Sequence, residues 1–390
     1  MSEFITKIST SGVETAYHRT SGVLVHSDID PLSEALSSAR MLCQQNTKSV
    51  LLIGHGFGYL YDALRRFGVE CTSIELFAGL HSLAGKAKST QQTKLILSRD
   101  SLAATVRMSA PDARIIIASY IMALRRELSE DLADYLDLLH VMQQSQQVYA
   151  PTIQYNVQRN LPHLNELTRF VAADHASEKF AIAIGAGPTL SMCLDTLKEW
   201  RQHIILVSAS GASSILSGHG LVPDWIIAME ARNTIVRDMD STEKDSKVLV
   251  FPWTHPDVLN NTYFNRVLAN DSDYFATDGG SSGLVAADLC ARISSSAIFM
   301  LGMDMSDTRG EYSEGGNRTT ANVPLHSPKF SVMRAAVCEW RQKLASREVY
   351  HIVTPGTPEV AGTIRLYPAE LSIALARCRN SLAAVGERLA

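Results

Sequence analysis

Short apolar runs alternate with helical stretches and glycine loops through the first third of the chain. Strands are predicted at residues 49–53, 71–76 and 114–118, and helices at residues 30–45 and 59–67. A loop containing Gly54, Gly56 and Gly58 joins the first of these strands to the helix that follows it. Strands that alternate with helices favour a parallel sheet with helices on both of its faces.

The second half of the chain shows the same alternation more regularly. Apolar runs predict strands at residues 180–184, 204–208, 225–229, 248–251, 297–301 and 349–353. Helices are expected between them, for example at residues 190–200 and 284–293. Residues 304–330 form a long polar segment without periodicity, and connections of that length are typical of lids or binding loops.

The stretch between the two halves is helical, because its leucines recur at steps of three and four residues. Asn160-Leu161-Pro162-His163 interrupts this pattern. We therefore predict an α/β protein with two Rossmann-like doubly wound domains joined by helices. The expected parts are an N-terminal domain at 1–120, a helical connector at 121–175, a second α/β domain at 176–365 and a C-terminal helix at 366–390.

Composition narrows the class of protein. The chain has 390 residues and a net charge of -4, so a dedicated nucleic-acid binder, which would show a basic excess, is not expected. No apolar run is long enough to span a membrane, and residues 1–25 lack the apolar core of a signal peptide. The six cysteines form no close pair, which is typical of reduced thiols in a cytoplasmic protein. None of these features predicts an oligomeric state.

The first glycine loop has two interpretations. Gly54, Gly56 and Gly58 let the backbone approach a ligand, and Glu75 at the end of the next predicted strand is placed to bind a ribose hydroxyl. An S-adenosylmethionine methyltransferase or a dinucleotide enzyme shows this spacing. The alternative is a Rossmann-like domain that needs the glycines only for tight packing between strand and helix.

Three segments of the second half converge if the predicted sheet is parallel, because each follows a strand or opens a helix at the ligand-binding edge. They are the glycine loop Gly185, Ala186, Gly187, Pro188 and Thr189, the segment Gly280, Ser281, Ser282 and Gly283, and the strand end Gly302-Met303-Asp304. Pro188 suits a first helical turn, whose free amides attract phosphate. Ser210, beyond the 204–208 strand, is expected at the same edge. The sequence therefore predicts a phosphate-binding crevice.

The order of these segments, with Gly220-Leu221-Val222-Pro223-Asp224-Trp225 between them, resembles the bacterial motility accessory factor (Maf) glycosyltransferases. Their central domain is shared with an archaeal 6-hydroxymethylpterin diphosphokinase family. The resemblance covers roughly residues 50–365 and includes the 160–163 segment. The same segments are similar, more distantly, to the bacterial sialyltransferases that build lipooligosaccharide.

The resemblance implies transfer of a nonulosonic acid (of the sialic, pseudaminic or legionaminic type) from a CMP-activated donor to a hydroxyl of flagellin or of a glycan. The CMP-sugar is then a substrate, and no cofactor is required. In the sialyltransferases a histidine after the lid is the general base, and His326 resembles it in placement. Tyr312, eight residues past Asp304, resembles the lid tyrosine that contacts the phosphate.

The resemblance is incomplete at two positions. Ala186 stands where the sialyltransferases carry an asparagine, and Ser306 stands where they carry a second lid tyrosine. His219 and His255 are lesser candidates for the base. Asp304 would orient the base, bind a sugar hydroxyl or cap its loop. No carboxylate pair or other metal site is recognisable.

Two other functions stay open at this point. One is pyrophosphoryl transfer from ATP to a pterin, which normally needs carboxylate-bound magnesium. The other is a non-catalytic module that binds a nucleotide or an acceptor protein.

Overall fold

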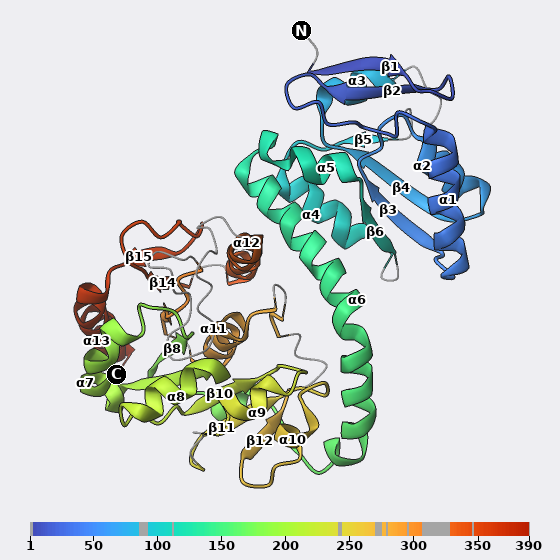
Figure 1. The fold of residues 1–390 in the computed structure, drawn as a ribbon. Coiled ribbons are helices and arrows are strands. Elements are labelled where there is room, and N and C mark those ends of the chain that lie inside the picture. The colour runs from blue at the N-terminus through green and yellow to red at the C-terminus, as the bar shows by residue number, and fades with distance from the viewer. Residues whose placement is uncertain are drawn as a thin grey trace. The chain divides into compact units, whose positions relative to one another are not determined.

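The structure is a computed structural model that describes residues 3–85, 93–110, 113–240, 244–269, 275–277, 280–294, 296–305, 328–344 and 347–389 (Figure 1). The chain divides into two compact units, Met1–Gln143 (unit 1) and Gln144–Ala390 (unit 2). Each contains a parallel sheet flanked by helices, so the predicted α/β class with two Rossmann-like doubly wound arrangements is confirmed. The boundary lies inside the predicted connector, within helix α6 (Glu130–Leu164).

Unit 1 begins with an antiparallel hairpin, β1 (Phe4–Ile8) and β2 (Glu14–His18), in a region where the polar sequence predicted no strand. Its parallel sheet has the order β5-β4-β3-β6 among the described residues. The strands are β3 (Ser49–Ile53), β4 (Glu70–Glu75), β5 (Lys94–Leu95) and β6 (Arg114–Ile117). The helices are α1 (Pro31–Gln44), α2 (Tyr59–Arg66), α3 (Ala78–Ala84), α4 (Arg99–Met108) and α5 (Ser119–Leu124).

Local chemistry explains where α1 begins. The Asp30 side chain accepts a hydrogen bond from the Ser33 amide at 3.1 Å, and Pro31 occupies the first helical turn, where no amide is needed. One face of α1 carries Ala35, Ala39 and Leu42 into a core shared with α2 and the sheet.

In the described part of unit 2, parallel strands form one sheet with the order β15-β14-β13-β8-β9-β10-β11-β12-β7. The strands are β7 (Thr168–Arg169), β8 (Phe180–Ile184), β9 (Ile204–Ala209), β10 (Trp225–Ala228), β11 (Lys247–Val250), β12 (Asn265–Leu268), β13 (Ile298–Leu301), β14 (Val349–Ile352) and β15 (Ile364–Leu366). After β8 the chain continues through β9 to β12 on one side, and it returns on the other side with β13. The order therefore reverses between β8 and β13, which is where open α/β sheets bind their ligands.

The helices of unit 2 are α7 (Leu194–Trp200), α8 (Ser210–Gly218), α9 (Thr234–Asp238), α10 (Pro256–Leu259), α11 (Ser282–Ile293), α12 (Pro328–Lys343) and α13 (Leu371–Leu389). Figure 1 shows α11 and α12 on one side of this sheet and α7, α8 and α13 on the other. Alternation along β8 sorts its side chains between the faces: Ala181 and Ala183 lie under α11, and Ile182 and Ile184 face α7 and α8.

Two predicted features of unit 2 are wrong. The 160–163 segment does not interrupt the helix, because α6 continues through Pro162 to Leu164. Pro151 also lies inside α6, and each of these prolines removes one backbone hydrogen bond without ending the helix. The helix predicted at residues 190–200 begins later, since Ser191–Cys193 is a single 3-10 turn and α7 starts at Leu194. Pro188 therefore lies before the helix and not in its first turn.

Candidate functional site

The loops after β8 and β13 meet at the point where the strand order reverses. The Gly185 amide donates to the Leu301 carbonyl at 2.8 Å, and the Gly187 amide donates to the Gly302 carbonyl at 2.8 Å. A Cβ atom built on Gly185 would lie 2.3 Å from the Gly302 oxygen. Because no real Cβ comes so close to an oxygen, glycine is required where these two backbones cross.

Asp304 joins the same two loops through its side chain. Its Oδ2 accepts hydrogen bonds from the Thr189 hydroxyl at 2.9 Å and from the Thr189 amide at 3.3 Å. The Thr189 oxygen in turn accepts from the Gly302 amide at 3.0 Å. Asp304 is 3% exposed, so in this structure its carboxylate holds the loop, one of the three roles considered from the sequence.

These contacts also occupy amides that the sequence offered to a phosphate. Besides Gly187 and Thr189, Leu190 donates its amide to the Gly187 carbonyl at 3.0 Å. The helix dipole expected at Pro188 is displaced, because α7 starts at Leu194. A phosphate contact at the glycine loop, including Ala186, stays a prediction.

The 280–283 segment is brought to the same place. Gly283 lies against Met303, whose Sδ would be 3.3 Å from a Cβ on Gly283, and Met303 would likewise be 3.1 Å from a Cβ on Gly185. We call residues 185–189, 280–283 and 302–305 the switch-point cluster. Convergence of these three segments was expected from their order in the sequence, and the structure shows it.

Within this cluster, the start of α11 has the geometry that best fits an anion. Ser281 is its N-cap residue, and the amides of Ser282 and Gly283 precede the first backbone hydrogen bonds of the helix, which Leu284 and Val285 donate to the Ser281 carbonyl. The helix has 12 residues, so its dipole places partial positive charge at Ser281, Ser282 and Gly283. Gly280 precedes it with a φ of 61°. Ser210, the first residue of α8, lies beyond β9 at the same edge of the sheet and is 6% exposed.

Sequence reasoning missed two residues that support the 302–305 turn. His351 on β14 donates from Nε2 to the Met303 carbonyl at 2.8 Å, and Arg334 on α12 donates to the Met305 carbonyl at 3.1 Å. Burial lowers the pKa of His351 to about 4, so this imidazole is neutral near pH 7. Both side chains lie in apolar stretches, and no motif in the sequence marks them.

Three positions of the predicted lid, Tyr312, His326 and Ser306, lie outside the described residues. Of the lesser histidine candidates, His255 follows β11 at the switch-point edge, where its Nδ1 accepts from the Asp257 amide at 3.3 Å. His219 follows α8 and lies at the opposite edge of the sheet.

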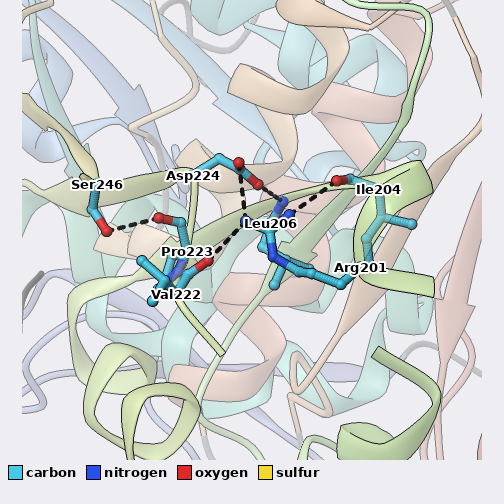
Figure 2. Close-up of polar contacts among 7 residues, drawn as sticks. All are labelled: Arg201, Ile204, Leu206, Val222, Pro223, Asp224 and Ser246. Atoms are coloured by element: carbon cyan, nitrogen blue, oxygen red, sulfur yellow. Dashed lines mark hydrogen bonds and ion pairs between the residues drawn. The ribbon is translucent and has the colours of Figure 1, made fainter. Parts of the chain in front are cut away.

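The Gly220–Trp225 motif also lies at that opposite edge, because it leads into the amino end of β10. Figure 2 shows the polar contacts that Val222, Pro223 and Asp224 make there. Asp224 accepts from the Leu206 amide at 2.8 Å and from Arg201 at 3.0 Å. Arg201 also donates to the Val222 carbonyl at 2.9 Å, and the Ser246 hydroxyl donates to the Pro223 carbonyl at 2.7 Å. This motif joins the amino ends of β9, β10 and β11, so its role in the structure is to align strands.

In unit 1, side chains of the protein itself occupy the space beside the glycine loop Gly54–Gly58. Glu75 is 1% exposed, and its carboxylate accepts from the Gly56 amide at 3.0 Å and from the Tyr120 hydroxyl at 2.6 Å. His26 Nε2 accepts from the Phe57 amide at 2.9 Å and lies where a Cβ on Gly56 would be, 2.4 Å away.

Burial raises the pKa of Glu75. Gly54 packs against the segment that follows β6. Gly54 and Gly58 both have a positive φ, a conformation that favours glycine. This arrangement favours the interpretation in which the glycines and Glu75 serve packing, and a second ligand site at this loop stays a prediction.

Comparisons with known proteins agree with the resemblance for the central domain. A family model described as 6-hydroxymethylpterin diphosphokinase MptE-like matches residues 152–310. The predicted similarity to that family is therefore confirmed over the segment that carries Gly185, Ser281 and Asp304. No curated protein matches the chain.

Two solved structures are distantly similar. A Maf glycosyltransferase from Magnetospirillum magneticum AMB-1 shares 11% identity over 98% of this chain and 74% of that chain, with a TM-score of 0.45. MnmC2 from Aquifex aeolicus shares 12% identity over 75% of this chain and 86% of that chain, with a TM-score of 0.17.

The described residues contain no group of three or more His, Cys, Asp or Glu side chains that could hold a metal ion. None of the helices in the described ranges is long and apolar enough to span a membrane.

Proposed function

We propose that this chain is a glycosyltransferase that moves a nonulosonic acid from a CMP-activated donor to a hydroxyl of a flagellin-like protein or of a glycan. The observation that carries the proposal is the switch-point cluster, which gathers Gly185, Ser281 and Gly302 at the carboxyl ends of β8 and β13. A parallel sheet binds phosphorylated ligands at this position.

The CMP phosphate would lie at the start of α11. There the amides of Ser282 and Gly283 and the hydroxyls of Ser281 and Ser282 supply donors, and the helix dipole adds partial positive charge. Such groups also stabilise the charge that develops on the departing CMP, an effect typically worth several kcal/mol. Ser210 would lie on the nucleoside side, beyond β9.

The transfer step needs a base for the acceptor hydroxyl. We assign this role to His326, because a histidine titrates near neutral pH and this one resembles the sialyltransferase base in placement. The acceptor oxygen attacks the anomeric carbon, the bond from that carbon to the CMP phosphate breaks, and the hydroxyl proton passes to His326. Tyr312 would donate to the phosphate.

The family description of residues 152–310 favours a second candidate, pyrophosphoryl transfer from ATP to a pterin. That reaction normally uses magnesium held by carboxylates. Asp304, the buried carboxylate of the cluster, is instead held by Thr189. We therefore rank the glycosyl transfer first.

Thermal unfolding with nucleotides separates the two. CMP at about 100 times its Kd would add roughly 2.7 kcal/mol and, for a unit of this size, raise the Tm by about 5–10 °C in the presence of a chelator. A shift seen only with ATP and magnesium would contradict the CMP site and favour the pterin kinase instead.

Two variants locate the site. Ser281→Asp places a good N-cap residue at α11, so the fold should be kept, but its charge repels a phosphate and the CMP shift should vanish. Ser98→Asp makes the same change at the N-cap of α4 and serves as the control. His326→Ala should abolish transfer while leaving the CMP shift intact. Unchanged transfer by this variant would disprove the assignment of the base.

A further inference from the structure

Two buried asparagines of α6 bind the loops that follow β10 and β11. Asn156 donates from Nδ2 to the carbonyls of Ala231 at 2.7 Å and Trp253 at 3.0 Å. Asn160, one turn later on the same helix face, donates to the carbonyls of Pro252 at 2.9 Å and Thr254 at 2.8 Å. Both side chains are at most 2% exposed. The two side-chain amide groups thus donate hydrogen bonds to four backbone carbonyls at the ligand-binding edge.

These two loops also bind each other. The Trp253 indole donates to the Met229 carbonyl at 3.0 Å, and the His255 amide donates to the Glu230 carbonyl at 3.2 Å. We call residues 229–232 and 252–255 the β10–β11 wall. Its backbone is fixed by bonds within it and by α6 from outside.

The wall presents charged and aromatic groups. Glu230 and Arg232 form two bonds, Nε to Oε1 at 3.0 Å and Nη2 to Oε2 at 2.8 Å. Their side chains are 32% and 51% exposed, so ligands can reach them. The Arg232 guanidinium lies over the Tyr149 ring, 5.3 Å from its centre. Stacking on an aromatic ring restricts the orientation of a guanidinium.

The wall adjoins the switch-point cluster. Met229 and Trp253 pack against the same buried cluster as Met303 and Phe275. Strand β10 lies two positions from β8 in the sheet, which is about 10 Å at the usual strand spacing. The Arg232 side chain would span most of this distance, because a carboxylate on the anomeric carbon of the sugar lies beside the phosphate.

We propose that the β10–β11 wall is the subsite for the sugar of the donor, with Arg232 pairing the sugar carboxylate and with Asn156 and Asn160 as positioning residues. This inference rests on the proposed function. A nonulosonic acid carries a carboxylate on its anomeric carbon, beside the phosphate. A guanidinium has five N–H donors in one plane, and a carboxylate can pair with either of two edges. Glu230 binds the Nε–Nη2 edge, so the sugar carboxylate would pair with the Nη1–Nη2 edge.

The test uses the full chain with two probes, CMP alone and CMP-activated sialic acid. Arg232→Met keeps the stem of the side chain and removes its charge at an exposed position, so the variant should fold. Its KM for the activated sugar should rise roughly 10- to 100-fold, the effect of a lost charge-assisted hydrogen bond, while its Kd for CMP stays that of the wild type. An unchanged KM, or an equal loss of CMP binding, would overturn the sugar assignment.

Asn156→Asp tests the positioning role. The carboxylate replaces an amide that donates to two carbonyls, so the wall should shift and KM should rise with little change in kcat or in CMP affinity. Lower pH should restore part of the effect, because a protonated carboxyl group donates one bond. Asn261→Asp is the matched control, since Asn261 uses its oxygen to accept from the Tyr263 amide and an aspartate keeps that bond.

The outcomes separate the two proposals. A wild-type protein that binds neither probe would overturn the proposed function and this inference with it. A wild-type protein that uses the activated sugar, with an Asn156→Asp variant that matches it in KM, would overturn the positioning role alone.

Discussion

Where the 185–189 and 302–305 loops cross, an alanine in place of Gly302 should destabilise unit 2 for two reasons, a steric clash and a strained backbone conformation. In Gly302→Ala the new Cβ would lie 2.1 Å from the Gly185 oxygen, and the residue would keep a φ of 65°. Overpacking costs about 1–3 kcal/mol, and a left-handed conformation adds roughly 1–2 kcal/mol for a residue with a side chain. The free energy of unfolding of unit 2 should therefore fall by about 2–5 kcal/mol.

Two further variants isolate these costs. Gly220→Ala keeps a φ of 72° with no atom within 4 Å of the new Cβ, so only the conformational cost remains. Gly185→Ala places its Cβ 2.3 Å from the Gly302 oxygen without a positive φ, so only the overpacking cost remains.

Scanning calorimetry should rank Gly302→Ala lowest in Tm, and each 1 kcal/mol is about 2–4 °C for a unit of this size. If Gly302→Ala and Gly220→Ala differ by less than about 2 °C, the backbone crossing is not what requires glycine.

Three more variants follow from the described contacts. Glu75→Gln replaces an acceptor oxygen with an amide group that faces other hydrogen-bond donors. The free energy of unfolding of unit 1 in urea should therefore fall by about 1–3 kcal/mol, while CMP binding persists. An unchanged urea midpoint would contradict the internal role of Glu75. His351 has a native pKa of about 4, below the unfolded value near 6.5, so the unfolded chain takes up the proton first and stability is lost as pH falls from 6.5 towards 4. His351→Gln should flatten that slope in urea titrations. Thr189→Val removes the hydroxyl that bridges Asp304 and Gly302 and should cost about 1–3 kcal/mol, whereas Thr189→Ser should behave as the wild type in the same melts.

The long apolar strands and their order were predictable from the chain. The runs that form β8, β9 and β13 are continuous, and such runs are typical of the buried centre of a parallel sheet. Gly185 follows β8 directly and Gly302 follows β13 directly. The convergence of Gly185, Gly283 and Gly302 followed from that order. The short strands β7 and β15 gave no usable pattern, because two or three residues show no periodicity.

The chemistry of the site was less predictable, because it depends on contacts between distant segments. Gly187 looked free to bind phosphate, and only the fold shows that its amide is bound to Gly302. The sequence pattern predicts a break in the helix at Asn160, whereas in the structure this side chain is a buried donor to the loop after β11. No motif marks His26 in its polar segment, although it occupies the glycine loop of unit 1.

The pairing of β8 with β13 has a consequence for how unit 2 is made. Thr189 and Asp304 are 115 residues apart in sequence, so the switch-point cluster cannot form until most of the unit has left the ribosome. Contacts of such long range slow folding, because a large loop must close before they contribute. Strands β8 to β11 have local partners and can assemble earlier with one edge of β8 uncovered. The nascent chain would then expose an unpaired central strand, and this interval is where we expect chaperone binding and aggregation to compete with folding.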